Sequence, residues 1–262
     1  MGKYALICGG YINETIITDT CFSVVEDLPE PRIKLLFPRA FAASVALHNN
    51  SVLWVTGGIV LNGRAHQSTE LLNISLGQST PGPLLPMPLH SHCTVQINEF
   101  QVLLIGGMNE EMKAQNSTFL YDFHLNEWTQ GPDLITARYG HVCGLVYDRK
   151  NEPILVVAGG LNPLAKVSTS LELLKLKSAK EWIEGPGLPG HLIGASMQTI
   201  GDQGVIVHGH NFLFVKCQTL RRCRIERLAL SEEYPLHRQL MDKKYAVTMA
   251  MPGKTNSRNC AF

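Results

Sequence analysis

The chain has 262 residues, a formal net charge of +1, and 45% hydrophobic against 17% charged residues. A balance so close to neutral gives no global attraction to nucleic acid or to an anionic membrane surface. No stretch reaches about 18 apolar residues, so we expect neither a transmembrane helix nor membrane insertion.

Pairs of glycines recur along the chain at intervals of about fifty residues, and each pair closes a short apolar run. The pairs are Gly9-Gly10, Gly57-Gly58, Gly106-Gly107 and Gly159-Gly160, with Gly209-His210 as a degraded fifth copy. A period of this length predicts a repeat architecture in which one supersecondary unit is used several times.

Four short β-strands are expected in each repeat. The runs before the glycine pairs, residues 4–8, 52–56, 102–105, 154–158 and 205–208, are apolar without alternation, which is typical of strands covered on both faces. A β-like stretch precedes most of them, at 41–47, 93–97, 139–147 and 193–200. A polar loop, a third stretch and a shorter fourth stretch follow, and the fourth carries Trp128 or Trp182. Four short strands per repeat predict a propeller blade.

These motifs resemble the kelch repeat. The matching features are the strand that ends in Gly-Gly, the Leu120-Tyr121-Asp122 segment, Trp128 and Trp182 at similar distances from their glycine pairs, and the Arg138-Tyr139-Gly140-His141 opening. The second repeat has Ser79 where the tryptophan is expected. The resemblance implies an all-β fold, a β-propeller of about five four-stranded blades, in which the motif glycines and aromatic residues build the core between blades.

The first blade lacks its own first strand. Residues 244–251 resemble the opening strands of the other repeats, so we expect the C-terminal segment to join the N-terminal blade and close the ring. A single propeller would then span residues 1–252, with a flexible tail at 253–262. The alternative is that the chain is part of a larger propeller.

Seven cysteines are present. Cys8 and Cys21 fall on neighbouring antiparallel strands, and Cys217 and Cys223 flank a short turn, so both pairs are candidate disulfides. Such bridges favour a secreted protein, whereas free buried thiols would suit a cytosolic propeller.

No catalytic motif is found, and we expect neither a catalytic site nor a cofactor. The sequence has no Gly-x-Ser-x-Gly elbow and no phosphate-binding loop. The His90-Ser91-His92 and His208-Gly209-His210 segments each offer two imidazoles on one face of a strand, but no further ligand stands at metal-binding spacing, so we expect no metal. The basic segment 216–227 reads either as a patch for an acidic peptide or phosphate, or as a solvated hairpin.

Binding is expected in the loops after the glycine pairs, at 11–18, 59–67, 108–116, 161–167 and 211–215, because loops on a rigid frame carry recognition. Their candidate binding residues are Asn62, Arg64, His66, Asn109, Glu110, Glu111, Lys113, Asn162 and Lys166. We therefore expect a monomeric, non-catalytic module for a protein or peptide partner that does not bind nucleic acid. The alternatives are an enzyme or carbohydrate-binding propeller with its ligand in the central channel, and, by family resemblance, the substrate-recognition part of a cullin-3 ubiquitin ligase adaptor.

Overall fold

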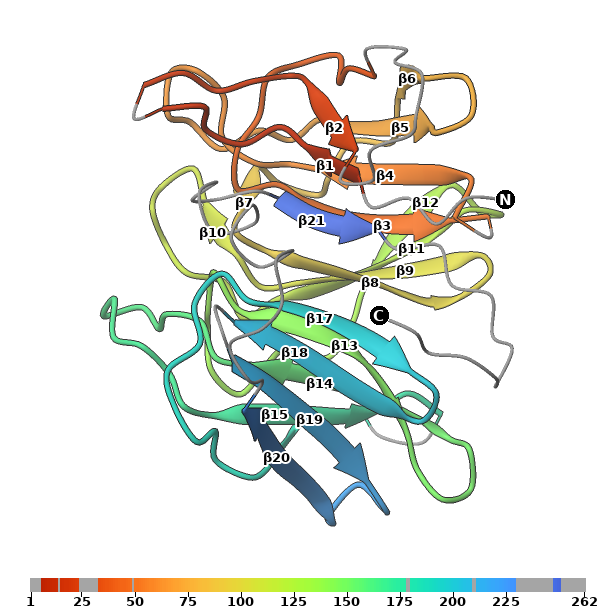
Figure 1. Cartoon of the computed structure of the whole chain (residues 1–262), viewed down its shortest axis with the longest axis vertical. Helices are drawn as coiled ribbons and strands as arrows, with labels where there is room; N and C mark the ends of the chain where they lie inside the picture. Colours follow the sequence, from red (N-terminus) through yellow and green to blue (C-terminus); the bar gives the residue numbers. More distant parts are fainter. Residues whose placement is uncertain are drawn as a thin grey trace.

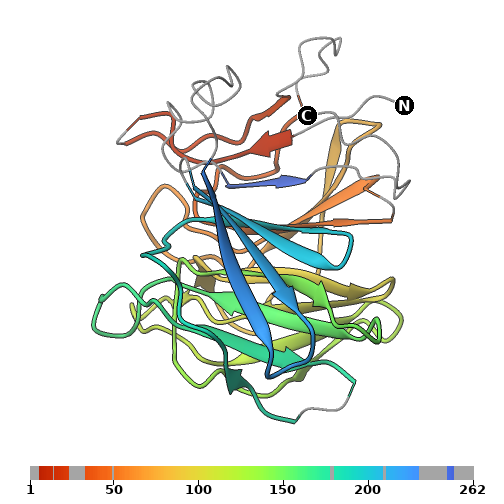
Figure 2. The ribbon, with the colours of Figure 1, turned by 60° about the horizontal axis from the view of Figure 1, so that its bottom comes forward.

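A computed structural model describes residues 6–13, 15–23, 33–48, 50–177, 180–208, 211–229 and 247–250. This part of the chain contains β-strands and no α-helix (Figures 1 and 2). No helix within it is long and apolar enough to cross a membrane. The expected tail at 253–262 lies outside these residues.

The strands form four four-stranded sheets and one three-stranded sheet, numbered here in chain order. The first sheet contains β2 (Cys21–Ser23), β1 (Leu6–Cys8) and β21 (Val247–Ala250). The second contains β3 (Ala43–Leu47), β4 (Val52–Thr56), β5 (Thr69–Asn73) and β6 (Gln78–Pro81). The third contains β8 (Cys93–Asn98), β9 (Gln101–Ile105), β11 (Thr118–Asp122) and β12 (Glu127–Gln130). The fourth contains β13 (Val142–Tyr147), β14 (Pro153–Ala158), β15 (Leu171–Lys175) and β16 (Ile183–Glu184), and the fifth contains β17 (Ser196–Ile200), β18 (Gln203–His208), β19 (Asn211–Cys217) and β20 (Cys223–Ala229). The short strands β7 (Leu89–His90) and β10 (Met108–Asn109) pair separately.

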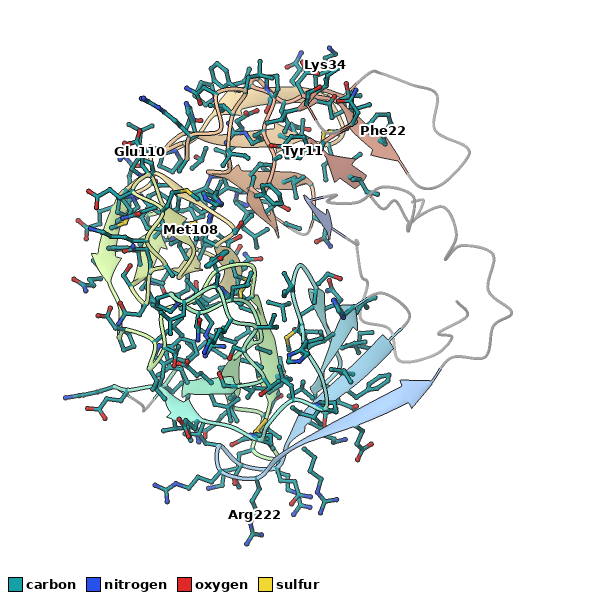
Figure 3. The ribbon with its side chains drawn as sticks, turned by 90° about the vertical axis from the view of Figure 1, so that its left-hand side faces the viewer. Tyr11, Phe22, Lys34, Met108, Glu110 and Arg222 are labelled. Atoms are coloured by element: carbon teal, nitrogen blue, oxygen red, sulfur yellow. A yellow bond between two sulfur atoms is a disulfide. The ribbon has the colours of Figure 1, made fainter. Side chains whose placement is uncertain are left out.

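The sheets stand side by side in a propeller-like arrangement (Figure 3), and their innermost strands are β21, β3, β8, β13 and β17. Strand β21 contacts β3, β3 contacts β8, β8 contacts β13, and β13 contacts β17. The expectation of five four-stranded blades was wrong for the described residues, where four sheets are complete and the first has three strands. Its innermost strand, β21, pairs antiparallel with β1 and comes from the C-terminal segment.

One predicted loop is a strand. Residues 211–215 were expected to form a polar loop after the degraded glycine pair, but they belong to β19, which pairs with β18 from His208 opposite Asn211 onwards. The run Phe212-Leu213-Phe214-Val215 explains the difference, because aromatic and β-branched residues favour a strand.

The glycine pairs connect neighbouring sheets. In each of the four pairs both glycines have positive φ. The second glycine donates its N–H to a carbonyl that precedes the next sheet, as in Gly58 to Leu89 at 2.9 Å and Gly107 to Arg138 at 2.9 Å. A Cβ on Gly57 would lie 2.3 Å from the Leu89 oxygen. Only glycine permits both the left-handed backbone and this close approach, so one pair occurs in each of the first four sheets.

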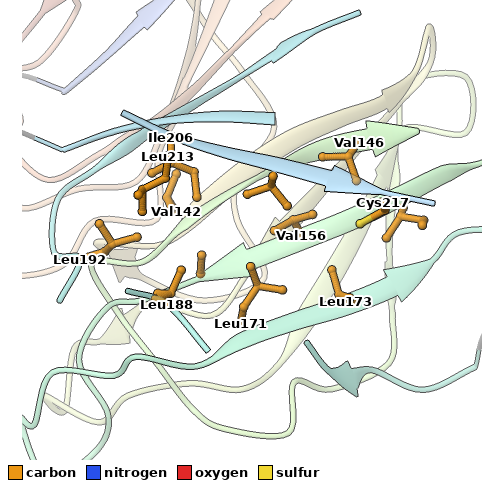
Figure 4. Packing of buried hydrophobic residues seen from close by; sticks show 13 residues of the cluster. Val142, Val146, Val156, Leu171, Leu173, Leu188, Leu192, Ile206, Leu213 and Cys217 are labelled. Atoms are coloured by element: carbon orange, nitrogen blue, oxygen red, sulfur yellow. The ribbon is translucent and has the colours of Figure 1, made fainter. Parts of the chain in front are cut away.

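Tryptophan joins the outer strands of neighbouring sheets. The indole N–H of Trp128, in the third sheet, donates to the carbonyl of Leu84, which follows the second sheet, at 2.8 Å. Trp182 repeats the bond to the carbonyl of Pro132 at 2.8 Å. Between the fourth and fifth sheets, buried aliphatic side chains fill the joint, among them Val156, Leu171 and Ile206 (Figure 4). Burial of this continuous apolar material supplies the main stabilisation.

The second, third and fourth sheets also have a buried clamp, defined here as the contact between the residue four positions before the first strand and a residue on the third strand. In the second sheet Arg39 pairs with Glu70 at 2.5 Å, and both side chains are almost fully buried. Arg39 also donates to the carbonyl of Gly57 at 2.7 Å, and Glu70 accepts the N–H groups of Leu36 and Phe37. A buried ion pair needs such additional hydrogen bonds to offset its desolvation.

The fourth sheet repeats this ionic clamp at the same positions. Arg138 pairs with Glu172, donates to the Gly159 carbonyl at 3.0 Å, and leaves Glu172 to accept the N–H groups of Ile135 and Thr136 at 2.8 and 3.1 Å.

The third sheet replaces the ionic clamp with an apolar one. Leu89 stands at the arginine position and Phe119 at the glutamate position, and both belong to one apolar cluster. Pro86 stands where Ile135 donates its N–H in the fourth sheet, so one donor is removed together with its acceptor. The fifth sheet has Leu192 and Pro189 at the corresponding positions. In the third sheet the arginine, the glutamate and one N–H donor are thus all replaced together.

Three disulfides cross-link the described residues. Cys8–Cys21 joins β1 to β2, and Cys217–Cys223 joins β19 to β20. Cys93–Cys143, which the sequence analysis did not anticipate, joins the innermost strands of the third and fourth sheets. Disulfides are typical of oxidising compartments, so the three bridges weakly favour an extracellular environment.

Candidate binding face

A chain of backbone hydrogen bonds links four sheets on one side of the propeller-like arrangement, just before their innermost strands. Ser91 N donates to the Phe41 carbonyl at 2.8 Å, Gly140 N to the Ser91 carbonyl at 2.7 Å, and Gly194 N to the Gly140 carbonyl at 3.0 Å. All four residues have positive φ, between 52° and 62°, just before the first strand of their sheets. Left-handed backbone is unfavourable for Phe41 and Ser91, so this chain of hydrogen bonds is kept at a local cost in free energy.

The post-glycine loops and the linkers between sheets lie on the same side as this chain of hydrogen bonds. Backbone pairs connect the two sets, including Ala40 with Ile59 and Tyr139 with Leu161. We call this side the loop face, made of the post-glycine loops 11–17, 59–65, 108–114 and 161–167 with the linkers 33–40, 82–89, 131–139 and 185–193. The loops project to the left in Figure 1, and Figure 3 looks onto them, with Tyr11 and Met108 labelled.

Each post-glycine loop is closed by a bridge between residues six apart, such as Ile59 with Ala65 and Met108 with Ala114. The asparagines that were candidate binding residues build these turns. Asn109 Oδ1 accepts the N–H groups of Glu111 and Lys113 at 3.1 and 2.9 Å, and Asn162 Oδ1 accepts those of Leu164 and Lys166 at 3.0 Å each. Their side-chain oxygens therefore hold the loop rather than face a partner.

Asn62 stands two positions later in its loop than Asn109 and Asn162 do in theirs, and its Oδ1 accepts the N–H of Arg64 alone at 3.0 Å. The third and fourth loops therefore share one asparagine arrangement, and the second loop has a different one.

The charged candidates lie together on the third and second loops. Arg64 approaches Glu110 of the next sheet's loop at 3.8 Å, and Lys113 pairs with Glu111 at 2.7 Å. The hydrogen bond from Lys113 lowers the pKa of the Glu111 carboxyl below its ordinary value. Lys166, on the fourth loop, has no ion pair with a described residue. The opposite charges largely compensate one another and leave little net field over the loop face.

His66 lies deeper than the other candidates. Its Nδ1 contacts the Ser68 hydroxyl, which also accepts from Arg39 at 3.0 Å, and its ring packs on Phe37 at 6.1 Å. Burial lowers the pKa of His66, and the nearby Arg39 charge lowers it further against the opposing effect of Glu70. His66 is therefore joined to the clamp of the second sheet.

The two histidines of the first His-x-His segment have separate partners. His92 is buried between sheets with its Nε2 2.8 Å from Thr56 Oγ1, and burial lowers its pKa to about 3. His90 contacts the Ser91 hydroxyl at 3.0 Å. His210 lies outside the described residues. Within the part of the chain that is described, no three metal-ligating side chains come together.

The sequence analysis missed the apolar side chains of the loop face. Fifteen large apolar residues are exposed among the described residues, and ten of them belong to the loops and linkers of this face. They are Ile12, Ile16, Leu36, Phe37, Leu61, Leu84, Met112, Ile135, Leu164 and Ile193. Only four, namely Leu76, Phe100, Leu125 and Ile200, lie in the turns of the opposite face. The signal in the sequence is a large apolar residue in each post-glycine loop, which the prediction from polar residues did not use.

One such residue stands at the tip of each post-glycine loop. Ile12, Leu61, Met112 and Leu164 are 65 to 74% exposed. Tyr11 packs edge-on against Phe41 at 5.9 Å, beside His90 at 6.4 Å from Phe41. Exposed apolar side chains at the loop tips therefore lie around the aromatic pair of Tyr11 and Phe41.

Two hollows are found away from this aromatic pair. One of about 560 Å³ lies between turns of the second and third sheets, lined by His48, Asn50, Gln96 and Glu99 with Ala46. The other, of about 280 Å³, lies at the tip of the β19–β20 hairpin. Both are on the face opposite the loops.

Comparison with known proteins identifies the fold. No protein-family model matches the chain, and no curated protein matches it. Among solved structures it is similar to YjhT, with a TM-score of 0.56 and 13% identity over 81% of this chain and 69% of that chain. At this identity the likeness shows the β-propeller fold alone.

Proposed function

We propose that this chain is a non-catalytic interaction module that binds a protein partner through the loop face. The observation that carries the proposal is the gathering of exposed apolar side chains there. Exposed apolar patches on a soluble domain mark interaction surfaces more often than isolated exposed residues do. The near-neutral charge pattern around them suits a partner held by apolar contact with a polar rim.

The third loop supports this proposal independently. Met112 is 69% exposed and has a φ of 59°, at a loop position that is left-handed in three loops, with Gly63 at 74° and Ala165 at 54°. A non-glycine residue in this region costs about 1–2 kcal/mol. An exposed methionine stabilises little in the fold to offset that cost, and strained positions of this kind concentrate at functional sites.

The test compares partners captured by three proteins. The first is the intact chain, and the second carries Leu61→Ser, Met112→Ser and Leu164→Ser. The third carries Leu76→Ser and Leu125→Ser on the opposite face as the matched control. We expect the loop-face variant to lose captured partners that the control retains. Retention of the same partners by all three proteins would refute the proposal.

We also infer a kelch-type ring of five blades, completed by the C-terminal segment. The pairing of β21 with β1 supports this inference, since it places residues from both ends of the chain in one sheet. Deletion of residues 247–262 should increase amide hydrogen exchange at Leu6 and Cys8 by at least about tenfold and leave Val156 protected. Unchanged exchange at Leu6 and Cys8 would contradict the inference.

A further inference from the structure

The tip of the β19–β20 hairpin carries a cluster of cations that form no ion pair with a described residue. Arg221, Arg222 and Arg224 are exposed and follow one another around the tip, with Arg222 projecting away from the sheets (Figure 3). The turn between β13 and β14 lies against it, because Arg149 N donates to the Gln218 carbonyl at 3.4 Å. That contact adds the exposed side chains of Arg149 and Lys150 to the same region.

Carboxylates nearby do not neutralise this cluster. Asp202 pairs with Lys216 at 3.3 Å, while Asp148 and Glu152 both pair with Lys175. Asp148 is also turned inward, where backbone N–H groups hold its pKa below the ordinary value. Glu226, two residues beyond Arg224, is the one exposed carboxylate along the hairpin without an ion pair to a described residue. Five cations thus face one such carboxylate, although the whole chain has a net charge of only +1.

The hairpin tip is held in place. Cys217 and Cys223 form a disulfide across the last pair of β19 and β20, with Cα atoms 4.0 Å apart. Within the turn, Gln218 N donates to the Arg222 carbonyl and Arg222 N to the Thr219 carbonyl, both at 2.9 Å. Cys217 belongs to the buried cluster between the fourth and fifth sheets, against which Leu220 packs (Figure 4). The arginines therefore extend from a fixed backbone, which lowers the entropy lost when a ligand binds.

A hollow of about 280 Å³ opens at this tip, lined by Gln218, Arg222, Cys223 and Arg224. Two guanidinium groups beside a polar amide suit a tetrahedral oxyanion, since the planar fork of arginine donates paired hydrogen bonds to neighbouring oxygens. The remaining cations lie outside this hollow on two exposed turns. A ligand that reaches all of them must repeat its anionic groups along an extended chain.

We propose that the disulfide-linked tip of the β19–β20 hairpin, with the adjoining turn at Arg149 and Lys150, is a binding site for a sulfated polysaccharide. This site is separate from the loop face and independent of the proposed function. A sulfated sugar chain supplies regularly spaced tetrahedral anions and belongs to the extracellular environment that the three disulfides favour. The segment from Cys217 to Cys223 has no aromatic side chain on which nucleic-acid bases would stack.

The test uses immobilised dextran sulfate, with neutral dextran as the blank. Arg221→Gln, Arg222→Gln and Arg224→Gln are combined in one variant. Arg64→Gln, Lys113→Gln and Lys166→Gln are combined in a control that removes the same charge from the loop face. We expect the hairpin variant to bind about tenfold more weakly, from three exposed charge contacts, and the control to change by less than about twofold. Equal losses would show that binding follows net charge and would overturn the proposal, as would undiminished binding by the hairpin variant.

Competition separates the ligand classes. Soluble polyglutamate and a short DNA duplex, each at matched total charge, should compete several-fold less well than dextran sulfate. Equal or better competition by either one would overturn the assignment to a sulfated chain.

The Cys217→Ser, Cys223→Ser variant keeps every charge and should bind dextran sulfate several-fold more weakly. Unchanged affinity would contradict the role of the Cys217–Cys223 disulfide in holding the site.

Discussion

Replacing the ionic clamp of the fourth sheet by the apolar clamp residues of the third sheet tests whether the two sets are equivalent in packing. The fourth sheet has Arg138 and Glu172, and the third has Leu89 and Phe119 at the corresponding positions. If the two sets are alternative solutions to one packing problem, the third-sheet residues should function in the fourth sheet only when they are introduced together.

Removing one charge of the Arg138–Glu172 pair should lower the free energy of unfolding substantially. Glu172→Phe leaves Arg138, which is fully buried, without its counter-charge, although the guanidinium still donates to the Gly159 and Ser170 carbonyls. Breaking a buried pair in this way costs about 3–5 kcal/mol, because the remaining charge stays desolvated. For a chain of this size, that loss lowers Tm by roughly 10 °C. Arg138→Leu should cost a similar amount for the converse reason.

The combined exchange should recover much of this loss. Arg138→Leu with Glu172→Phe removes both charges, and Ile135→Pro removes one of the two N–H donors that Glu172 satisfies. One donor, Thr136 N, remains without its acceptor, at a cost of about 1–3 kcal/mol. We therefore expect the triple variant to lie within about 2–3 kcal/mol of the parent, well below the sum of the single losses.

Urea unfolding at constant m-value measures these differences directly. The double-mutant cycle for Arg138 and Glu172 should give a coupling energy of about 2–3 kcal/mol. Additive losses, with the triple variant as unstable as the single losses combined, would refute the interpretation of the clamps as interchangeable sets.

Two further predictions concern the joints between sheets. Gly57→Ala should cost several kcal/mol more than Gly63→Ala, since both glycines are left-handed but only the Cβ at Gly57 would meet the Leu89 carbonyl; equal losses in chemical denaturation would contradict the contact argument. The pKa values of His92 and His141 are lowered by burial to about 3, against about 6.5 in an unfolded chain. The unfolded chain therefore binds two more protons between these limits, and stability should be fully present above about pH 6.5 and fall by about 2.7 kcal/mol per pH unit near pH 4.5. Replacing both histidines by alanine should flatten that dependence, and an unchanged slope in unfolding measurements would contradict it.

The repeat could be predicted from sequence because its constraints are local. Glycine pairs are required wherever the backbone is left-handed and touches the next sheet, so Gly57-Gly58 and its counterparts mark every joint. Trp128 and Trp182 are fixed by the same geometry, since each indole reaches the linker of the preceding sheet. Three first strands, β3, β13 and β17, begin two or three residues later than predicted, whereas β8 begins at Cys93 as predicted. The left-handed residue that precedes these strands has no single residue type, so the sequence does not mark it.

The remaining features depend on contacts between distant residues. The Cys93–Cys143 bridge depends on which innermost strands become neighbours, and a cysteine count does not contain that information. The clamps depend on a register that brings residue 138 to residue 172 across two turns. On the loop face, the asparagines were chosen because they are polar, yet Asn109 and Asn162 satisfy backbone donors of their own loops. The apolar tips beside them became visible only when exposure was known.

The most direct test of the loop face is site-specific photo-crosslinking with the assembled protein. A photoreactive side chain is placed in turn at Leu61, at Leu164 and, on the opposite face, at Leu76, all three of which are well exposed. We expect one protein partner to be cross-linked from both positions 61 and 164 and not from position 76. Cross-linking of that partner from position 76, with or without positions 61 and 164, would contradict binding through the loop face.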